Sequence, residues 1–302
     1  MLASGMLDAV VIVTPDHLHH DMALQAFARG MHVLSEKPLA RTAADARDML
    51  AAAQASGRVL MMMFTWRWFA IPMFGKQLID DGYIGHCREA QFSMQAGYAD
   101  DAVYGWRFDP EQGSGISGDL GSHMIDMARW YLGEISRVNG RLVTNVARPG
   151  PDGEQMESLN DSAAALVEFA SGACGTINVS AARVVGWAPE VEIRLYGDEG
   201  SLKLNFGLDE GRIQGRRRGD EYWGELVPPE NLLGTGGPNP AIMDLPSLAP
   251  FTNLPVGDRL FVDAILDGHP AEPTFEDGWR VQEVIDAVRK SDHTSGWVSV
   301  SS

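Results

Sequence analysis

Short apolar runs alternate with longer helical stretches at the start of this chain, and this alternation limits its fold more than any other feature. The runs 8–15 and 31–34 are rich in Val, Ile and Leu, and residues 16–30 between them are predicted to form a helix. A helix over 43–55 and another apolar run over 58–65 repeat the unit. Strands that alternate with helices form parallel sheets. We therefore predict a parallel, doubly wound sheet.

Strand-like segments dominate the rest of the chain. Gly-rich turns such as Ser171-Gly172 and Asp198-Glu199-Gly200 separate several of them, which is typical of antiparallel hairpins. We predict an α/β unit in residues 1–82 and an α+β unit with a large, mainly antiparallel open sheet in residues 83–302. The Gly- and Pro-rich residues 207–257 are predicted to be mostly irregular. The predicted strands cover 89–98, 138–146, 163–169, 175–181, 191–196 and 201–205, and the predicted helices cover 72–81, 119–132, 258–267 and 275–290.

The composition narrows the possible partners and the location of the protein. The 302 residues carry a formal net charge of −17, which argues against nucleic acid because phosphates would be repelled. The basic run 216–218 is followed by two acidic residues and is interpreted as a solvated turn. Two cysteines make no disulfide framework, which favours a reducing cytoplasm. No apolar segment is long enough to span a membrane, and the first residues lack a signal-peptide pattern, so we predict a cytoplasmic protein without membrane contact.

Glu36-Lys37-Pro38 closes the apolar run 31–34. Open α/β sheets bind ligands at the carboxyl ends of their strands, where Lys37 would lie, and Pro38 restricts the backbone beside it. Partial burial and neighbouring charge are expected to bring the pKa of Lys37 down toward neutrality, so that it could donate or accept a proton. The alternative is an ordinary surface lysine at the end of a strand.

Asp119, His123 and Asp126 fall at i, i+4 and i+7, which is one face of a helix. A carboxylate one turn from an imidazole can orient the ring and raise its basicity, which suits a general acid or base. An Asp N-cap followed by a buried histidine explains the same spacing. A metal site is a third interpretation, but no further ligand is evident nearby and we predict none.

The glycines of residues 113–118 match G-x-G-x-x-G, but the match is predicted to be misleading. They follow the polar residues 107–112 rather than a buried strand, and no β-α-β unit surrounds them. We interpret the segment as a flexible approach to the helix at residue 119, where backbone could come close to a ligand.

Clustered histidines and aromatic-flanked arginines are further candidates. His17, His19 and His20 follow the first strand and are predicted to line a cleft rather than bind a metal, because positions i and i+2 do not share a helix face. Arg67 lies between two tryptophans and Arg107 follows another. Such pairs can hold phosphate or sugar hydroxyls, or they can simply pack.

Taken together, these motifs resemble the Gfo/Idh/MocA (glucose–fructose oxidoreductase/inositol dehydrogenase) family over almost the whole chain. The resemblance implies an incomplete Rossmann-like, dinucleotide-binding domain in residues 1–82 and a substrate-binding domain in residues 83–302, usually oligomeric through its large sheet. It also implies oxidation of a hydroxyl of a sugar, inositol or sugar derivative, with NAD or NADP as cofactor. The motifs, in family order, are Asp8–His19, Gly30–Pro38, Trp106-Arg107, Gly118–His123 with Asp126, Tyr196–Leu202 and Pro273–Gly278.

The resemblance assigns expected roles to individual residues. Lys37 matches the lysine between nicotinamide and substrate, and His123 matches the acid/base that takes the hydroxyl proton. Asp119 matches the carboxylate that contacts the substrate or the histidine, and Trp106 and Arg107 match the substrate cleft. The positions expected around the cofactor are Thr14, Pro15, His19, Glu36, Lys37, Pro38 and Arg67.

The chain departs from the family pattern at its start. Family members open with a strand, a G-x-G-x-x-G loop, a helix and a second strand, and roughly 60 such residues are expected to be absent here. That loop would hold the pyrophosphate, and the second strand would distinguish NAD from NADP. A sheet without these strands is expected to expose an apolar edge.

Two other functions fit the same residues. A non-catalytic or truncated relative could bind sugar or a partner without turnover, which the absent phosphate loop favours. A lyase or glycosidase could keep NAD bound and use transient oxidation, which predicts product without net NADH.

Overall fold

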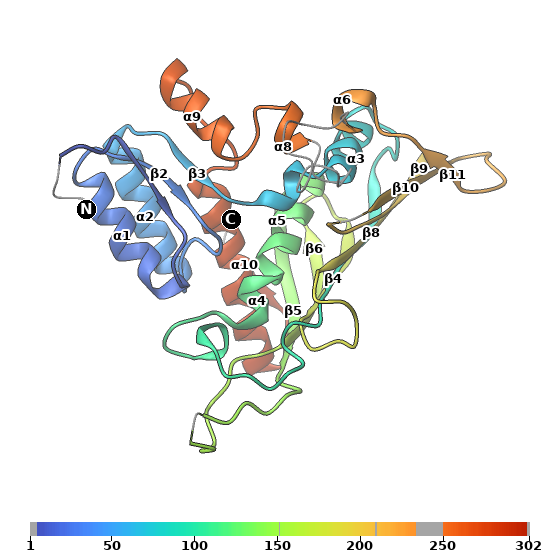
Figure 1. The fold of residues 1–302 in the computed structure, drawn as a ribbon. Coiled ribbons are helices and arrows are strands. Elements are labelled where there is room, and N and C mark those ends of the chain that lie inside the picture. Colours follow the sequence, from blue (N-terminus) through green and yellow to red (C-terminus); the bar gives the residue numbers. More distant parts are fainter. Residues whose placement is uncertain (1–4, 151, 209, 234–249, 301–302) are drawn as a thin grey trace.

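Two packed units make up the structure, a computed structural model that describes residues 5–150, 152–208, 210–233 and 250–300. Figure 1 shows a small parallel sheet with its helices beside a much larger sheet, and helix α10 (Phe275–Thr294) runs between the two. The predicted combination of a Rossmann-like parallel sheet with a large, mainly antiparallel sheet is confirmed.

The small sheet consists of the parallel strands β1 (Ala9–Ile12), β2 (His32–Ser35) and β3 (Leu60–Met62), in that order. Its connections are the 3-10 helix η2 (Asp16–Leu18) with helix α1 (His19–Phe27), and helix α2 (Ala43–Ser56). Thr42 begins α2 by accepting a hydrogen bond from the amide of Asp45, and Gly57 ends it with a φ of 61°. Both are ordinary helix-end signals, so the helix bounds follow from the sequence.

Both faces of the small sheet are covered, partly by helices from the far end of the chain. Val33 and Met62 pack in the core shared with α1, α2 and α10, whereas Leu34 and Met61 pack with Phe261 of α9 (Asp258–Asp267). The two crossover helices therefore share one face, and the second layer of the predicted doubly wound sheet comes from the C-terminal part. A domain division at residue 82 stays a prediction.

Strand β1 forms an edge of the small sheet and pairs with β2 alone among the described strands. Val11 in β1 and Val13 just after it are 52% and 68% exposed. The apolar edge expected from the sequence is therefore present.

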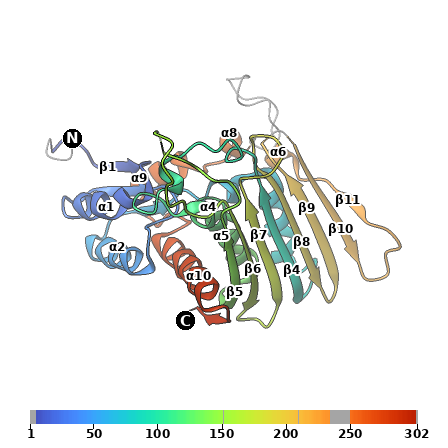
Figure 2. The same cartoon turned by 90° about the horizontal axis from the view of Figure 1, so that it is seen from below.

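In the described ranges, the large sheet has nine strands in the order β11-β10-β9-β8-β4-β7-β6-β5-β12, and Figure 2 shows the strands from β11 to β5 side by side. Neighbouring strands are antiparallel except β4 and β7, which are parallel. The strand bounds are β4 (Cys87–Gln95), β5 (Ile135–Val143), β6 (Ser162–Phe169), β7 (Cys174–Ser180), β8 (Glu190–Gly197), β9 (Gly200–Phe206), β10 (Gly211–Arg217), β11 (Gly224–Leu226) and β12 (Val298–Ser299).

One face of the large sheet carries the helices α3 (Ala70–Asp80), α5 (Gly121–Leu132) and α10. Phe92 and Met94 of β4 alternate with polar residues and are fully buried on this side. The opposite face leaves Val143 and Leu166 39% and 51% exposed. The sheet therefore has one core face and one face turned away from the helices.

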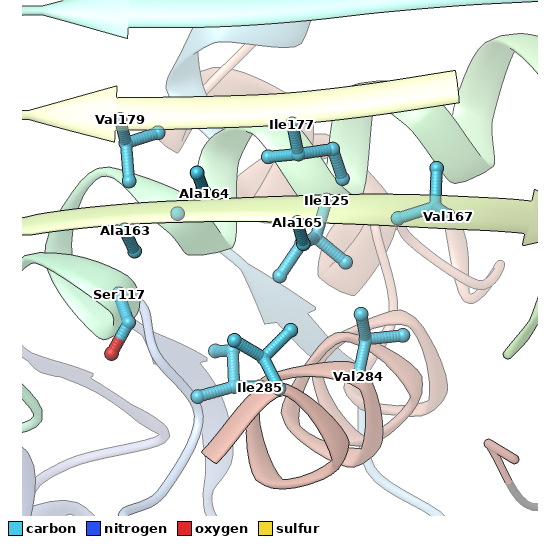
Figure 3. A pocket seen from close by; sticks show the side chains of 12 residues that line it. Ser117, Ile125, Ala163, Ala164, Ala165, Val167, Ile177, Val179, Val284 and Ile285 are labelled. Atoms are coloured by element: carbon cyan, nitrogen blue, oxygen red, sulfur yellow. The ribbon is translucent and has the colours of Figure 1, made fainter. Parts of the chain in front are cut away.

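A small cavity lies between the large sheet and its helices (Figure 3). Apart from Ser117 and Gly121, its lining side chains are aliphatic and come from β6, β7, α5 and α10. Because the cavity contains none of the residues expected to react or to bind cofactor, it is a gap in core packing and not the site.

Residues 207–257 are more regular than predicted. β10 and β11 form a hairpin at the sheet edge, so Arg216 and Arg217 lie in a strand rather than in a turn. Ile213 is the buried apolar side chain of β10, and a strand with so little apolar alternation is hard to read from sequence. The helices α6 (Glu230–Leu233) and α8 (Pro250–Asn253) follow, and residues 234–249 of this segment lie outside the described residues.

Candidate active site

Lys37 directly follows β2, at the edge where the parallel strands end. The amide of Glu36 donates a hydrogen bond to the carbonyl oxygen of Ile12 at 2.9 Å. The Lys37–Pro38 peptide bond is cis. From there Lys37 Nζ lies 2.6 Å from Asp119 Oδ1 and 3.0 Å from the Asp119 carbonyl oxygen. A single side chain thus joins the small sheet to the helices of the large one.

The ring of His19 links the segment that follows β1 to the segment that follows β2. The ring is fully buried, with Nδ1 2.9 Å from the carbonyl oxygen of Pro38 and Nε2 2.8 Å from that of Thr14. His19 therefore positions Thr14 and Pro38, two of the residues expected around the cofactor.

Three donors surround the carboxylate of Asp119. Oδ1 accepts from Lys37, and Oδ2 accepts from the Tyr98 hydroxyl at 2.6 Å and from Arg107 Nε at 2.9 Å. Burial alone would raise the pKa of Asp119, but the charges of Lys37 and Arg107 outweigh it and hold that pKa well below its usual range. Asp119 is therefore ionised at neutral pH.

The expected lowering of the Lys37 pKa is wrong. Burial does lower this pKa, but the negative charges of Asp119 and Glu36 outweigh burial, and the pKa of Lys37 lies above its ordinary value. Lys37 is therefore a cation at neutral pH and acts as a hydrogen-bond donor, not as a base.

His123 lies on α5 among aromatic side chains and is 6% exposed. The rings of Phe64 and Trp66 stand edge-on to it at centroid distances of 6.3 and 6.2 Å, and its Nδ1 is buried without a hydrogen-bond partner among the described residues. Burial lowers the pKa of His123 well below its usual value, and the charge of Lys37 lowers it further. The imidazole is therefore neutral at neutral pH and can accept a proton.

The helix predicted over 119–132 is interrupted. A short helix, α4 (Gly115–Asp119), ends at Asp119, and α5 begins at Gly121. The Asp119 carboxylate bonds Lys37, Tyr98 and Arg107 rather than His123. The structure thus contradicts the direct orientation of the imidazole by Asp119 that the spacing suggested, and aromatic packing holds the ring instead.

Asp126, the third residue of the i, i+4, i+7 pattern, binds Arg67. Arg67 donates to both oxygens of Asp126, at 2.7 and 2.6 Å, and to Asp277 of α10 at 3.3 Å. Arg67 lies in the 3-10 helix η3 (Thr65–Trp68), and its side chain is 8% exposed. The structure places Arg67 in a buried ion network between η3, α5 and α10, and its side-chain hydrogen bonds go to Asp126 and Asp277.

The glycines of residues 113–118 serve close packing rather than a flexible approach. Residues 115–118 are buried at the start of α4. Gly115 has a φ of +64°, and a Cβ there would lie 2.6 Å from Asn160 Nδ2, while a Cβ on Gly118 would lie 2.3 Å from the Ser114 Cβ. Gly118 also lies against Pro38, so these glycines let α4 approach the Lys37 strand end.

The remaining candidate residues differ in whether their contacts involve Lys37 or Asp119. The indole of Trp106 stacks under the Arg107 guanidinium, whose Cζ lies 4.5 Å from the ring centroid, and Glu36 accepts a hydrogen bond from the Lys37 amide. His17 bonds the carbonyl oxygen of Gln112, whereas His20 bonds Asp48 and does not approach the Lys37 pair.

Tyr98 is a site residue that sequence reasoning missed. It stands just beyond β4, and its even-numbered position continues the inward face of Phe92 and Met94. Burial and the charge of Asp119 raise the pKa of Tyr98, so the hydroxyl stays protonated and donates. The strand alternation could have marked Tyr98 as facing the helices, but not its bond to Asp119.

Two further observations limit the chemistry. Among the described residues, no group of three or more His, Cys, Asp or Glu side chains is placed to hold a metal ion. No helix in the described ranges is both long and apolar enough to cross a membrane.

Comparison with known proteins places this geometry in a family. The model of the GFO/IDH/MocA C-terminal domain matches residues 75–203, and the model described as oxidoreductase family, NAD-binding Rossmann fold, matches residues 1–64. The chain belongs to the Gfo/Idh/MocA family of oxidoreductases. The predicted resemblance and the predicted nicotinamide dinucleotide cofactor are confirmed.

Relatives of this Gfo/Idh/MocA oxidoreductase include proteins named as dehydrogenases of a sugar derivative and of inositol. Levoglucosan dehydrogenase from Pseudarthrobacter phenanthrenivorans is 28% identical over 97% of this chain and 80% of its own length. Inositol 2-dehydrogenase from Streptomyces avermitilis is 31% identical over 66% of this chain and 54% of its own length. The solved levoglucosan dehydrogenase complex with NADH and levoglucosan has a TM-score of 0.85 at 28% identity and covers 99% of this chain and 82% of that one.

The described residues of this Gfo/Idh/MocA oxidoreductase fit the nicotinamide end of such a cofactor. Thr14 and Glu36 follow the carboxyl ends of β1 and β2, and both are only half-buried there. On the other side of Lys37, the buried Nδ1 of His123 has no partner among the described residues, as expected where a bound molecule completes a site.

Proposed function

We propose that this oxidoreductase oxidises a hydroxyl of a sugar, cyclitol or sugar derivative, with NAD or NADP as hydride acceptor. The observation that carries the proposal is the meeting of three complementary groups at the carboxyl edge of the parallel sheet: a neutral His123, a cationic Lys37 and an ionised Asp119. The names of the relatives, levoglucosan dehydrogenase and inositol 2-dehydrogenase, support a polyhydroxylated substrate.

Each of the three groups has a separate task in this proposal. His123 accepts the proton of the reacting hydroxyl, because its buried imidazole is neutral at neutral pH. Lys37 donates a hydrogen bond to the same oxygen as negative charge develops on it. Asp119 keeps the ammonium in place through Oδ1.

The surrounding residues bind the two reactants. Thr14, Pro15 and Glu36 would hold the nicotinamide, which when bound would supply the acceptor for the hydride of the same carbon. Arg107, stacked on Trp106 in the 3-10 helix η4 (Trp106–Phe108), bonds Asp119, and its side chain is 43% exposed, so it can also donate to substrate hydroxyls.

Nicotinamide reduction measured across a panel of sugars and polyols, with NAD and NADP in turn, tests the proposal. We expect reduction by at least one substrate, with large losses in Lys37→Met and His123→Asn. His86→Asn is the matched control, because the His86 side chain is 97% exposed and lies far from the site. No reduction across the panel despite tight cofactor binding would sink the proposal. Product without net reduced nicotinamide would favour a lyase instead.

We also propose that copies of the chain associate through the face of the large sheet opposite its helices. Leu166 and Val143 are exposed on that face, and apolar side chains are usual in subunit contacts. A cytoplasmic location and the absence of a nucleic-acid partner remain part of the proposal, supported by the free thiols of Cys87 and Cys174 and by the net charge of −17.

A further inference from the structure

Arg148 is a buried cation that lies outside the groups around Lys37. The side chains of Arg148 and Asp161 are both 0% exposed, and Arg148 Nη1 lies 3.2 Å from Asp161 Oδ2. Asp161 also accepts hydrogen bonds from the amides of Asn145 and Val146, each at 2.9 Å. A buried ion pair adds little stability by itself. The role of Arg148 therefore depends on the other groups that its guanidinium contacts.

The guanidinium of Arg148 contacts both ends of the segment 98–108. Nη2 donates to the carbonyl oxygen of Ala99 at 2.5 Å, and Cζ lies 3.9 Å from the centroid of the Phe108 ring. Residues 100–103 between these contacts are exposed. The buried contacts at the two ends therefore determine where the segment lies, together with backbone bonds from Ala99 to Ala181 and from Leu159 to Phe108.

The immediate neighbours of Ala99 and Phe108 are the residues that bind Asp119. Tyr98 and Arg107 donate to the same atom, Asp119 Oδ2, at 2.6 and 2.9 Å. Arg148 bonds Val146, Asp161 and Ala99, and none of its hydrogen bonds goes to Asp119. Any effect of Arg148 on the site must therefore pass through the segment that it holds.

We propose that Arg148 is a positioning residue for the substrate site. By holding Ala99 and Phe108, it keeps Tyr98 and Arg107 on Oδ2 of Asp119. Oδ1 is thereby left to Lys37. This inference rests on the proposed function, because it takes the Asp119 group to be part of the substrate site.

The substitutions Arg148→Met and Arg148→Lys test the inference by steady-state kinetics. Lysine retains a charge for Asp161, but it cannot bond Ala99 and stack on Phe108 together. We expect kcat/KM for the carbohydrate to fall about tenfold to a hundredfold in Arg148→Met, as for a displaced binding group, with Arg148→Lys between it and the wild type. Cofactor affinity, measured by fluorescence titration with reduced nicotinamide, should not change.

Leu202→Ala is the control for a loss of stability alone. Leu202 is fully buried on β9 and pairs with Leu195 on β8, away from the segment 98–108. If Leu202→Ala lowers the melting temperature as much as Arg148→Met does, its kcat/KM should still stay near the wild-type value. An equal fall of kcat/KM in this control would overturn the inference, because Arg148 would then act through stability only.

A double-mutant cycle and hydrogen exchange separate this inference from the proposed function. If Arg148 acts through Tyr98, the fold-loss of kcat/KM in the double variant Arg148→Met, Tyr98→Phe should be smaller than the product of the two single fold-losses. Independent effects would contradict the inference. Amide exchange over residues 98–108 should also accelerate in Arg148→Met but not in Leu202→Ala. Unchanged amide exchange in Arg148→Met would refute the positioning role. Inactivity of the wild type on every carbohydrate would instead refute the proposed function, and the exchange experiment could still be read in that case.

Discussion

Lys37 Nζ and Asp119 Oδ1 lie 2.6 Å apart although 82 positions separate the two residues in the chain. The contact joins the end of β2 to the end of α4, and Gly118 makes it possible by letting α4 pack against Pro38. The pair therefore marks the place where the small parallel sheet and the helices of the large sheet meet to form one site.

Removing the ammonium in Lys37→Met should lower kcat by about a hundredfold or more, because a donor aimed at the developing negative charge is lost. The pKa of Asp119 should rise toward its usual value, since Lys37 makes the largest contribution to lowering it. Steady-state kinetics over a pH series measures both effects. Lys76→Met, which removes a lysine paired with Asp80 on α3, should change neither quantity.

The buried imidazole predicts how stability depends on pH. The pKa of His123 is lower in the folded protein than in the unfolded chain, where it is about 6.5. As pH falls below that value, the unfolded state binds a proton that the folded state does not, so His123 contributes a loss of stability on acidification. As the pH is lowered from about 8 to about 5, the melting temperature should fall less steeply in His123→Asn than in the wild type. Parallel curves would contradict a neutral, buried His123.

Tyr98→Phe removes one of the two donors to Asp119 Oδ2 and keeps the ring. A hydrogen bond to a charged group contributes about 1.5–3 kcal/mol, so we expect kcat/KM to fall about tenfold to a hundredfold. Tyr222→Phe is the matched control, since Tyr222 is 73% exposed and bonds its neighbour Glu221. Equal activity of the two variants would show that the Tyr98 hydroxyl has no part in the site.

Arg67→Met should destabilise the fold, because Asp126 would remain buried as an unpaired charge. Breaking a buried ion pair of this kind costs about 3–5 kcal/mol, which chemical denaturation can measure. Adding Asp126→Leu should restore part of the loss, since both charges are then gone. Arg137→Met, which breaks an exposed pair with Glu168, should leave the unfolding midpoint nearly unchanged.

Leu166→Glu tests the proposed association through the large sheet. Leu166 is 51% exposed on the face opposite the helices, so a charge there should disrupt contacts between copies without disturbing the core. Light scattering should show a smaller particle at unchanged melting behaviour. If the mass per particle stays the same as in the wild type, the proposed interface is wrong.

The elements with strong local signals were predictable, and those without were not. Apolar alternation marks β4 and β6, and Thr42 and Gly57 mark the ends of α2. Strand β10, which lies next to the edge strand β11, was missed because a strand with one covered face and a single buried apolar side chain has no clear pattern. The break between α4 and α5 was missed because it depends on packing around Asn160 and Pro38 rather than on helix propensity.

The sequence by itself determined the order of those strands and helices that have clear patterns, because apolar periodicity and turn residues are local features. Its motifs also marked Lys37, Asp119 and His123 as candidates. The tertiary structure decided what these groups do. It gave Asp119 the donors of Lys37, Tyr98 and Arg107, and it paired Arg67 with Asp126. It also left His123 Nδ1 without a hydrogen-bond partner in the described part of the chain. The reason is physical: a pKa depends on the balance between loss of water and nearby charge, and both arise from contacts between residues far apart in the chain.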